Sequence, residues 1–137
     1  MKNRALAREL ALKLLYAHEL GGAGATAEVL EQSESTVVLN ESDEKFMRGL
    51  VDGVLAQQET LDAVIAEHAV GWSLARLAKV DLLILRIAVY ELRHRPKIPA
   101  GATINEAVEL AKRFGEEKSY SFVNGVLGTV ARQGANA

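Results

Sequence analysis

The chain has 137 residues, of which 49% are hydrophobic, and a formal net charge of -2. This length and apolar content are typical of one domain whose core is stable without cross-links. The sequence contains no cysteine, which excludes disulfides, thiolate nucleophiles and thiolate metal sites and fits a reducing cytoplasm. The most apolar window, 80–92, contains three charged residues and is far shorter than the roughly 20 residues that cross a bilayer. We therefore expect one cytoplasmic domain over residues 1–137, without a membrane span.

The two signs of charge are segregated along the chain. Residues 24–67 carry ten acidic side chains and two basic ones, whereas residues 76–97 carry six basic side chains and two acidic ones. This segregation predicts a protein with one acidic and one basic side. The alternative is that the charges only keep surface helices solvated.

Helix is favoured almost throughout, because the sequence has two prolines and 5% aromatic residues and is rich in strong helix formers. We expect an all-α fold of about seven helices, a number estimated from the apolar spacing and the breakers. The expected helices cover 3–20, 26–35, a segment from 43 onward, 60–69, 80–94, 103–114 and 119–132.

Particular residues mark the ends of several expected helices. Gly21 and Gly22 end the first helix. The segment 80–94 is apolar on nearly every side, which is typical of a central helix surrounded by others. Two prolines predict an extended connector over 95–101. The segment 103–106 reads Thr-Ile-Asn-Glu, a capping box that predicts a helix start at Thr103.

Nothing in the sequence indicates catalysis. The three histidines lie in separate expected helices, without the spacing of a metal motif. No glycine-rich loop follows a strand, so nucleotide-cofactor binding has little support. Glu106 and Glu109 are not expected to act as paired catalytic carboxylates, because Glu106 has a use in the helix cap and Glu109 can pair with Lys112 or Arg113 across one helical turn. We expect a protein that is not an enzyme and has no metal and no cofactor.

Nucleic-acid binding requires positive charge near polar or stackable groups. The N-terminal end of the first helix offers four such residues: Lys2, Asn3, Arg4 and Arg8. A solvated helix face with no RNA-binding role has a similar composition, so charge alone leaves both interpretations open.

Longer segments carry a family resemblance. Residues 104–112 read INEAVELAK, residues 122–127 read FVNGVL, and residues 85–92 read LRIAVYEL. These segments, in this order and spacing, resemble the NusB family of bacterial transcription antitermination factors. The resemblance covers nearly the whole chain except the acidic region 22–40.

The resemblance implies an all-α fold of two small helical bundles packed together. It also implies a non-enzymatic function: binding of boxA RNA in ribosomal RNA leaders as a heterodimer with NusE, a small-subunit ribosomal protein. With NusA and NusG, such factors keep RNA polymerase elongating through terminators. Some members of the family self-associate, so a homodimer is a further expectation.

The resemblance assigns roles to individual positions. RNA binding falls on seven residues: Lys2, Asn3, Arg4, Arg8, Tyr16, Lys118 and Phe122. A contact with NusE falls on Asp81. Structural alternatives stay open, because Tyr16 and Phe122 also suit a helical core and Asp81 suits the positive end of a helix.

Two departures from the family concern RNA affinity. The family often has a denser run of arginines before position 8, and often an acidic or polar residue where this chain has Lys118. We expect Lys118 to offset the sparse N-terminal charge by one phosphate contact.

Two charged residues are expected to be structural. Arg86 and Glu91 lie in the predicted central helix, where a buried charge needs a partner. We expect Glu106 or backbone carbonyls to supply these partners.

Two other functions fit the same sequence. NusB-like domains also form the N-terminal part of ribosomal RNA methyltransferases, which predicts a stand-alone RNA-binding module here. A protein-interaction scaffold with incidental basic patches is the second alternative.

Overall fold

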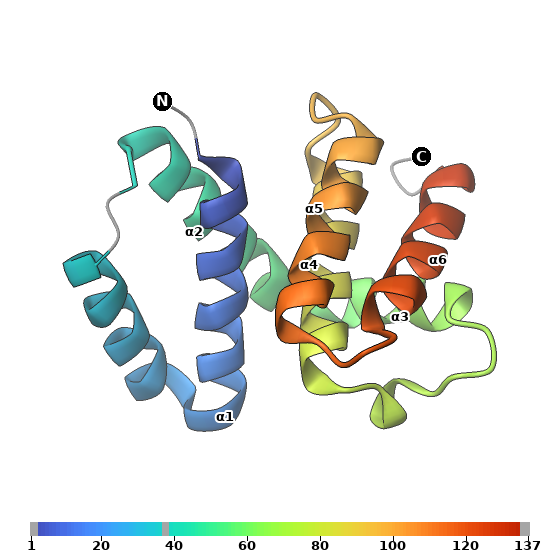
Figure 1. Cartoon of the computed structure of the whole chain (residues 1–137), viewed down its shortest axis with the longest axis horizontal. Coiled ribbons are helices and arrows are strands. Elements are labelled where there is room, and N and C mark those ends of the chain that lie inside the picture. The colour runs from blue at the N-terminus through green and yellow to red at the C-terminus, as the bar shows by residue number, and fades with distance from the viewer. Residues whose placement is uncertain (1–2, 37–38, 135–137) are drawn as a thin grey trace. The chain divides into compact units, whose positions relative to one another are not determined.

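The computed structural model describes residues 3–36 and 39–134, and over these ranges its regular elements are all helices. It contains six α-helices and one short 3-10 helix, η1 (Figure 1). In chain order they are α1 (Arg4–Thr36), α2 (Glu41–Ala56), α3 (Gln58–His68), η1 (Leu74–Arg76), α4 (Lys79–His94), α5 (Ala100–Phe114) and α6 (Ser119–Arg132). The chain divides into two compact units, one within residues 1–53 and one within residues 54–137. The prediction of an all-α fold is confirmed.

The first unit contains the interrupted helix α1. At Gly22 the backbone has a φ of 72°, a left-handed conformation that glycine adopts without a steric penalty. The chain reverses its direction there, so that the second segment of α1 runs back beside the first (Figure 1). The predicted helix end at Gly21 and Gly22 is confirmed, and the next helical segment begins sooner than the predicted residue 26.

Asparagine side chains begin both helices of the first unit. The Leu6 backbone N–H donates to Asn3 Oδ1 at 3.1 Å, and the Asp43 backbone N–H donates to Asn40 Oδ1 at 2.8 Å. Such bonds satisfy N–H groups that have no partner inside a helix. Asn3 and Asn40 therefore fix where α1 and α2 start.

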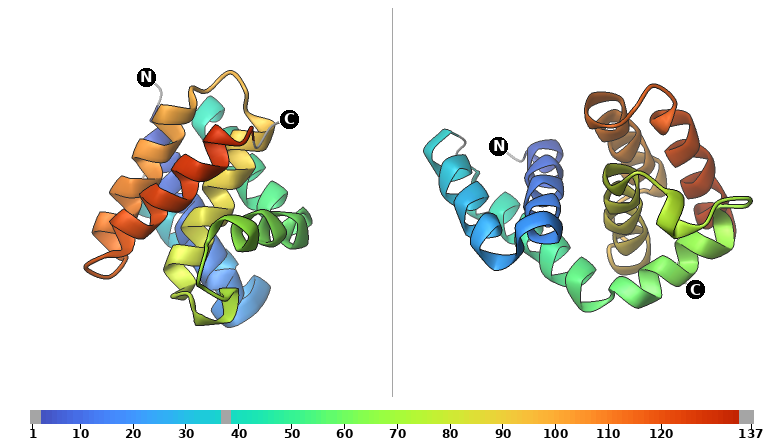
Figure 2. Two further views of the ribbon diagram at one scale, coloured as in Figure 1. Left: turned by 90° about the vertical axis from the view of Figure 1, so that its right-hand side faces the viewer. Right: turned by 90° about the horizontal axis from the view of Figure 1, so that it is seen from below.

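The second unit is built around α4. This helix contacts α3, α5 and α6, and all its residues from Asp81 to Glu91 are buried. Figures 1 and 2 show α3 running across α4 and α6 rather than alongside them. The prediction of a central helix over 80–94 is confirmed to within one residue.

The buried charges of α4 have partners on neighbouring helices. Arg86 donates to Asp62 of α3 through Nε at 2.7 Å and Nη2 at 2.9 Å. The Thr103 hydroxyl of α5 donates to Glu91 Oε1 at 3.4 Å. The expectation that both charged residues have partners is confirmed. The suggested partner Glu106 is wrong for Arg86, whose partner is Asp62.

The start of α5 differs from its prediction. The helix begins at Ala100, directly after Pro99, and no side chain caps it. Proline lacks an N–H to donate and therefore fits at a helix start. Thr103 lies one turn inside the helix, and its hydroxyl is used by Glu91. The predicted capping box is therefore wrong, and the connector ends at Pro99 rather than Gly101.

Candidate nucleic-acid interface

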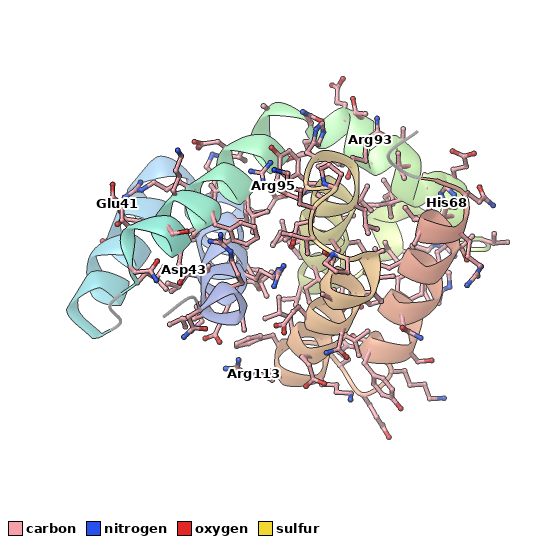
Figure 3. All side chains as sticks on the ribbon, turned by 90° about the horizontal axis from the view of Figure 1, so that it is seen from above. Glu41, Asp43, His68, Arg93, Arg95 and Arg113 are labelled. Atoms are coloured by element: carbon pink, nitrogen blue, oxygen red, sulfur yellow. The ribbon has the colours of Figure 1, made fainter. Side chains whose placement is uncertain are left out.

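The predicted RNA-binding residues at the start of α1 are anchored to α2. Arg4 Nη1 lies 3.0 Å from Asp43 Oδ1 and donates to the Ser42 carbonyl at 3.1 Å. The Asn3 backbone N–H donates to the second oxygen of the same Asp43 carboxylate. Figure 3 shows Asp43 on the side of α2 that faces the start of α1. Asp43 is therefore an acceptor for Arg4, the first residue of α1, and for Asn3, which directly precedes it.

The two arginines of this region differ in exposure. The Cζ atoms of Arg4 and Arg8 lie 4.4 and 5.2 Å from the centre of the Phe46 ring, within the range of cation-π attraction. Arg8 is only 5% exposed, whereas the Arg4 side chain keeps 29% of its surface exposed. Tyr16, further along α1, is exposed. Lys2 lies outside the described residues.

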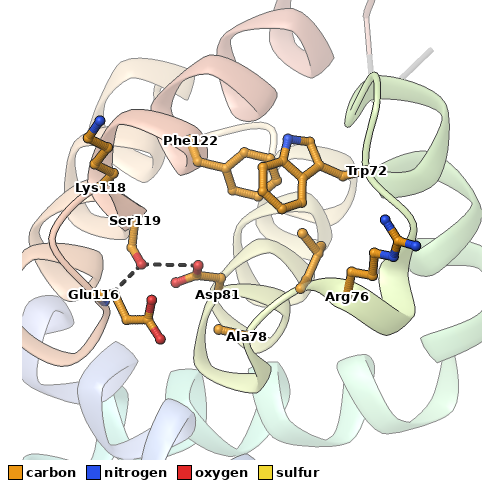
Figure 4. A pocket seen from close by; sticks show the side chains of 9 residues that line it. Trp72, Arg76, Ala78, Asp81, Glu116, Lys118, Ser119 and Phe122 are labelled. Atoms are coloured by element: carbon orange, nitrogen blue, oxygen red, sulfur yellow. Dashed lines mark hydrogen bonds between the residues drawn. The ribbon is translucent and has the colours of Figure 1, made fainter.

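In the second unit, three predicted site residues line one pocket. Asp81, Lys118 and Phe122 come from α4, the start of α6 and α6 itself, and the pocket has a volume of about 410 Å³ (Figure 4). Trp72 adds a second aromatic wall, since its ring lies edge-on to the Phe122 ring at a centroid distance of 5.5 Å. Trp72 is 53% exposed, so one aromatic side chain of the pair is open to solvent.

Asp81 is a mostly buried residue of the pocket lining. Its residue surface is 8% exposed. The Ser119 hydroxyl donates to Asp81 Oδ2 at 3.0 Å and accepts from the Glu116 backbone N–H at 2.9 Å. Asp81 Oδ1 is buried and has no hydrogen-bond partner among the described residues. Burial raises the pKa of the Asp81 carboxyl, the Ser119 bond opposes this rise, and the charge of Glu116 adds to it.

Gly115 makes the turn between α5 and α6 possible. A Cβ atom at this position would lie 2.6 Å from the Ser119 Cβ and 2.8 Å from the Ala111 carbonyl oxygen. Glycine therefore allows Ser119 to approach closely enough to hold Asp81. The φ of Gly115 is -90°, so glycine is required here for lack of space and not for a left-handed backbone.

Two residues that line the pocket, Trp72 and Arg76, were not identified from the sequence. Trp72 was assigned no functional role, and Arg76 was counted only among the basic residues of 76–97. Arg76 is exposed and lines the pocket across from Lys118 (Figure 4). No sequence signal links position 72 to position 122, because the two are 50 residues apart.

The described residues include no group of three or more histidine, aspartate or glutamate side chains placed to hold a metal ion. Among the same residues, none of the helices has the length and apolar character of a membrane span. What the second unit presents is a pocket that combines aromatic rings with both signs of charge. The fold and this site define an all-α protein whose second unit has a pocket of aromatic and charged side chains.

Comparison with known proteins names the family. The profile described as "NusB family" matches residues 5–132. The transcription antitermination protein NusB of Geotalea daltonii is 46% identical, with 96% of this chain and 95% of that protein covered. The NusB of Acetivibrio thermocellus is 44% identical, with 94% and 88% covered. The chain therefore belongs to the NusB family, a family of antitermination proteins that are not enzymes.

Solved structures agree with this assignment. NusB of T. maritima superposes with a TM-score of 0.85 and 34% identity, covering 98% of this chain and 95% of that one. A NusB solved with NusE and double-stranded RNA has a TM-score of 0.82 and 30% identity, with 95% and 96% covered. The NusB-like fold predicted from the sequence is confirmed.

Proposed function

We propose that this protein is a transcription antitermination factor that binds boxA RNA of ribosomal RNA leaders as a heterodimer with NusE. In the cytoplasm it acts with NusA and NusG to keep RNA polymerase elongating. The observation that supports this proposal best is the likeness, over 95% of the chain, to a NusB solved together with NusE and RNA.

In the second unit, Lys118 and Phe122 are the RNA contacts. Lys118 is exposed at the start of α6, where its ammonium group can neutralise a phosphate. Phe122 is half-buried and lines the pocket, so that its accessible edge can contact an unstacked base. The two residues combine the electrostatic and stacking parts of single-strand recognition.

In the first unit, the RNA contacts are Asn3, Arg4 and Tyr16, which are exposed or partly exposed. Lys2, which lies outside the described residues, is the fourth proposed contact. Arg4 is already held by Asp43 and still partly exposed, so it can meet a phosphate without a large loss of side-chain freedom. Arg8 is buried and contributes positive charge beneath this surface, with direct contact to RNA only after it leaves its place over Phe46.

The test is a titration of boxA RNA with and without purified NusE. We expect weak binding alone and tight, boxA-dependent binding with NusE, because the N-terminal cations are few and one of them is buried. A scrambled RNA of the same length is the control. In Lys118→Glu, the slope of log affinity against log salt should decrease by about one phosphate contact.

The outcomes separate the alternatives. A protein-interaction scaffold would bind NusE without gaining RNA affinity, and a stand-alone RNA module would bind RNA equally well with and without NusE. Absence of RNA binding even in the presence of NusE contradicts the proposed function.

A further inference from the structure

The basic segment 76–97 ends in a group of cations at the C-terminal end of α4. Arg93 lies in the last turn of the helix, and Arg95 and Lys97 follow in the connector to α5. Arg93 and Arg95 are labelled in Figure 3. Lys97 is exposed and the two arginines are partly exposed. We call Arg93, Arg95 and Lys97 the α4-end cluster.

The α4-end cluster is not neutralised by nearby carboxylates. Within the described ranges 3–36 and 39–134, none of its three cations forms an ion pair. Burial lowers the pKa of the neighbouring His94, and the charges of Arg93 and Arg95 lower it further. The surroundings of His94 are therefore positive.

Aromatic and backbone contacts hold this end of α4 in place. The Arg95 guanidinium donates to the His94 carbonyl at 3.2 Å, and its Cζ lies 5.4 Å from the centre of the Tyr90 ring. The His94 ring lies 4.6 Å from the Tyr90 ring, and its Nε2 is 2.8 Å from Gln57 Oε1. An arginine that is already held loses less side-chain freedom when it binds a ligand.

Compensation of the helix dipole accounts for only part of this charge. The C-terminal end of a helix carries about half a negative elementary charge, and its effect is confined to the last turn. The α4-end cluster carries three positive charges, and Lys97 lies three residues beyond the end of α4. Most of the positive charge is therefore available to a ligand.

A ligand with several negative charges fits this cluster better than a small anion does. A guanidinium group binds a phosphate through two parallel hydrogen bonds, and a lysine binds it as a point charge. A nucleic-acid strand presents successive phosphates and can meet all three cations. The proposed function already brings single-stranded RNA to this protein, which favours RNA over an acidic protein segment.

The α4-end cluster is separate from the pocket that contains Lys118 and Phe122. That pocket includes Asp81 in the first turn of α4, whereas the cluster begins in the last turn. Along the helix axis, Asp81 and Arg95 are about 20 Å apart. RNA that reaches the cluster is therefore additional to the nucleotides at the pocket.

We propose that Arg93, Arg95 and Lys97 form a second RNA surface, which binds phosphates of the single-stranded RNA that flanks boxA. The contacts are to phosphates, so this surface is indifferent to sequence. The inference rests on the proposed function, because boxA binding brings the flanking RNA to the protein.

The test compares RNAs of two lengths on the full-length protein with NusE. One RNA is the boxA element alone, and the others carry an oligouridylate extension at the 5′ or the 3′ end. We expect one of the extended RNAs to bind about tenfold more tightly than boxA alone at low salt. The slope of log affinity against log salt should also be steeper for that RNA.

Variants assign this gain to the cluster. Arg95→Gln/Lys97→Gln should abolish most of the tenfold gain and reduce the salt slope of the extended RNA by about 1.4, since each single-strand phosphate contributes about 0.7. Its affinity for boxA alone should stay the same. Lys97→Glu changes one exposed side chain of the connector and should lose part of the gain, without dependence on the packing of Arg95.

The matched control has the same net charge. Lys45→Gln/Arg48→Gln removes two exposed cations of α2, so it changes the total charge by the same amount at a different place. It should keep the full gain from the extension. Thermal unfolding of all the variants establishes that they are folded.

The outcomes separate this inference from the proposed function. If boxA binds and the extension adds nothing, or adds as much in Arg95→Gln/Lys97→Gln as in the parent, the inference is overturned and the proposed function stands. If boxA alone does not bind even with NusE, while oligouridylate binds and is weakened by the same variant, the proposed function fails and the RNA surface stands. Binding of polyglutamate through Arg95 and Lys97 without a gain from the RNA extension indicates an acidic protein partner and overturns the RNA inference.

Discussion

Replacing Asp62 by alanine is expected to lower the free energy of unfolding by about 3–5 kcal/mol, because it leaves the buried charge of Arg86 without its partner. The Arg86 side chain is only 5% exposed, and it reaches Asp62 at 2.7 Å. Its Nη1 atom already lacks a hydrogen-bond partner among the described residues. The loss would be a large fraction of the roughly 5–15 kcal/mol that stabilises an ordinary domain.

The reciprocal variant should be milder. In Arg86→Met the remaining Asp62 carboxylate is 23% exposed, so water can solvate it, and the methionine fills part of the vacated volume. We expect a loss of about 1–3 kcal/mol. The double variant should be more stable than Asp62→Ala alone, because no buried charge remains. Urea unfolding of the three variants measures these differences, and a double variant no more stable than Asp62→Ala would refute the assignment.

Replacing Asp43 by alanine should be the second most damaging change, with a loss of about 2–3 kcal/mol. The carboxylate is buried and accepts hydrogen bonds from the Arg4 guanidinium and the Asn3 backbone. Its removal leaves both donors without this acceptor and loosens the start of α1 from α2. Hydrogen exchange should therefore speed up first in the initial turns of α1.

A neighbouring carboxylate provides the control for Asp43. Glu44 forms an exposed pair with Arg48 on the surface of α2, and such pairs contribute little. Glu44→Gln should change the free energy of unfolding by less than about 0.5 kcal/mol. Equal effects of Asp43→Ala and Glu44→Gln would show that the buried anchor is not stabilising.

Sequence patterns within one helix predicted the features that depend only on residues close together in the sequence. The segment 119–132 was expected to be a helix and forms α6, Ser119–Arg132, because the spacing of its apolar residues is a signal contained within the segment itself. Glu109 was expected to pair with Lys112 or Arg113 across one helical turn, and it pairs with Lys112 at 3.5 Å. The resemblance to the NusB family extended these local predictions to the whole fold.

Partners that are distant in sequence were not predicted. Arg86 pairs with Asp62, which lies 24 positions away in the sequence. The sequence of residues 103–106 matches a capping box, but the helix starts after Pro99. The Thr103 hydroxyl donates to the buried carboxylate of Glu91 in α4 and does not cap the start of α5. The spacing of apolar residues along the sequence does not indicate which side chains of different helices will pair.

The candidate site shows the same limit. Sequence identified Lys118, Phe122 and Asp81 separately, and the structure places them around one pocket with Trp72 and Arg76. At the N-terminus, charge counting treated Arg4 and Arg8 alike, although Arg8 is buried. Whether a cation is available to RNA depends on packing, which composition does not report.

The most direct measurement of the central claim is transcription through a terminator placed after a ribosomal RNA leader, reconstituted with RNA polymerase, NusA, NusG and NusE. Adding this protein should increase read-through on a template with an intact boxA and leave a template with scrambled boxA unchanged. Equal read-through with and without the protein on the intact template would contradict its function as an antitermination factor.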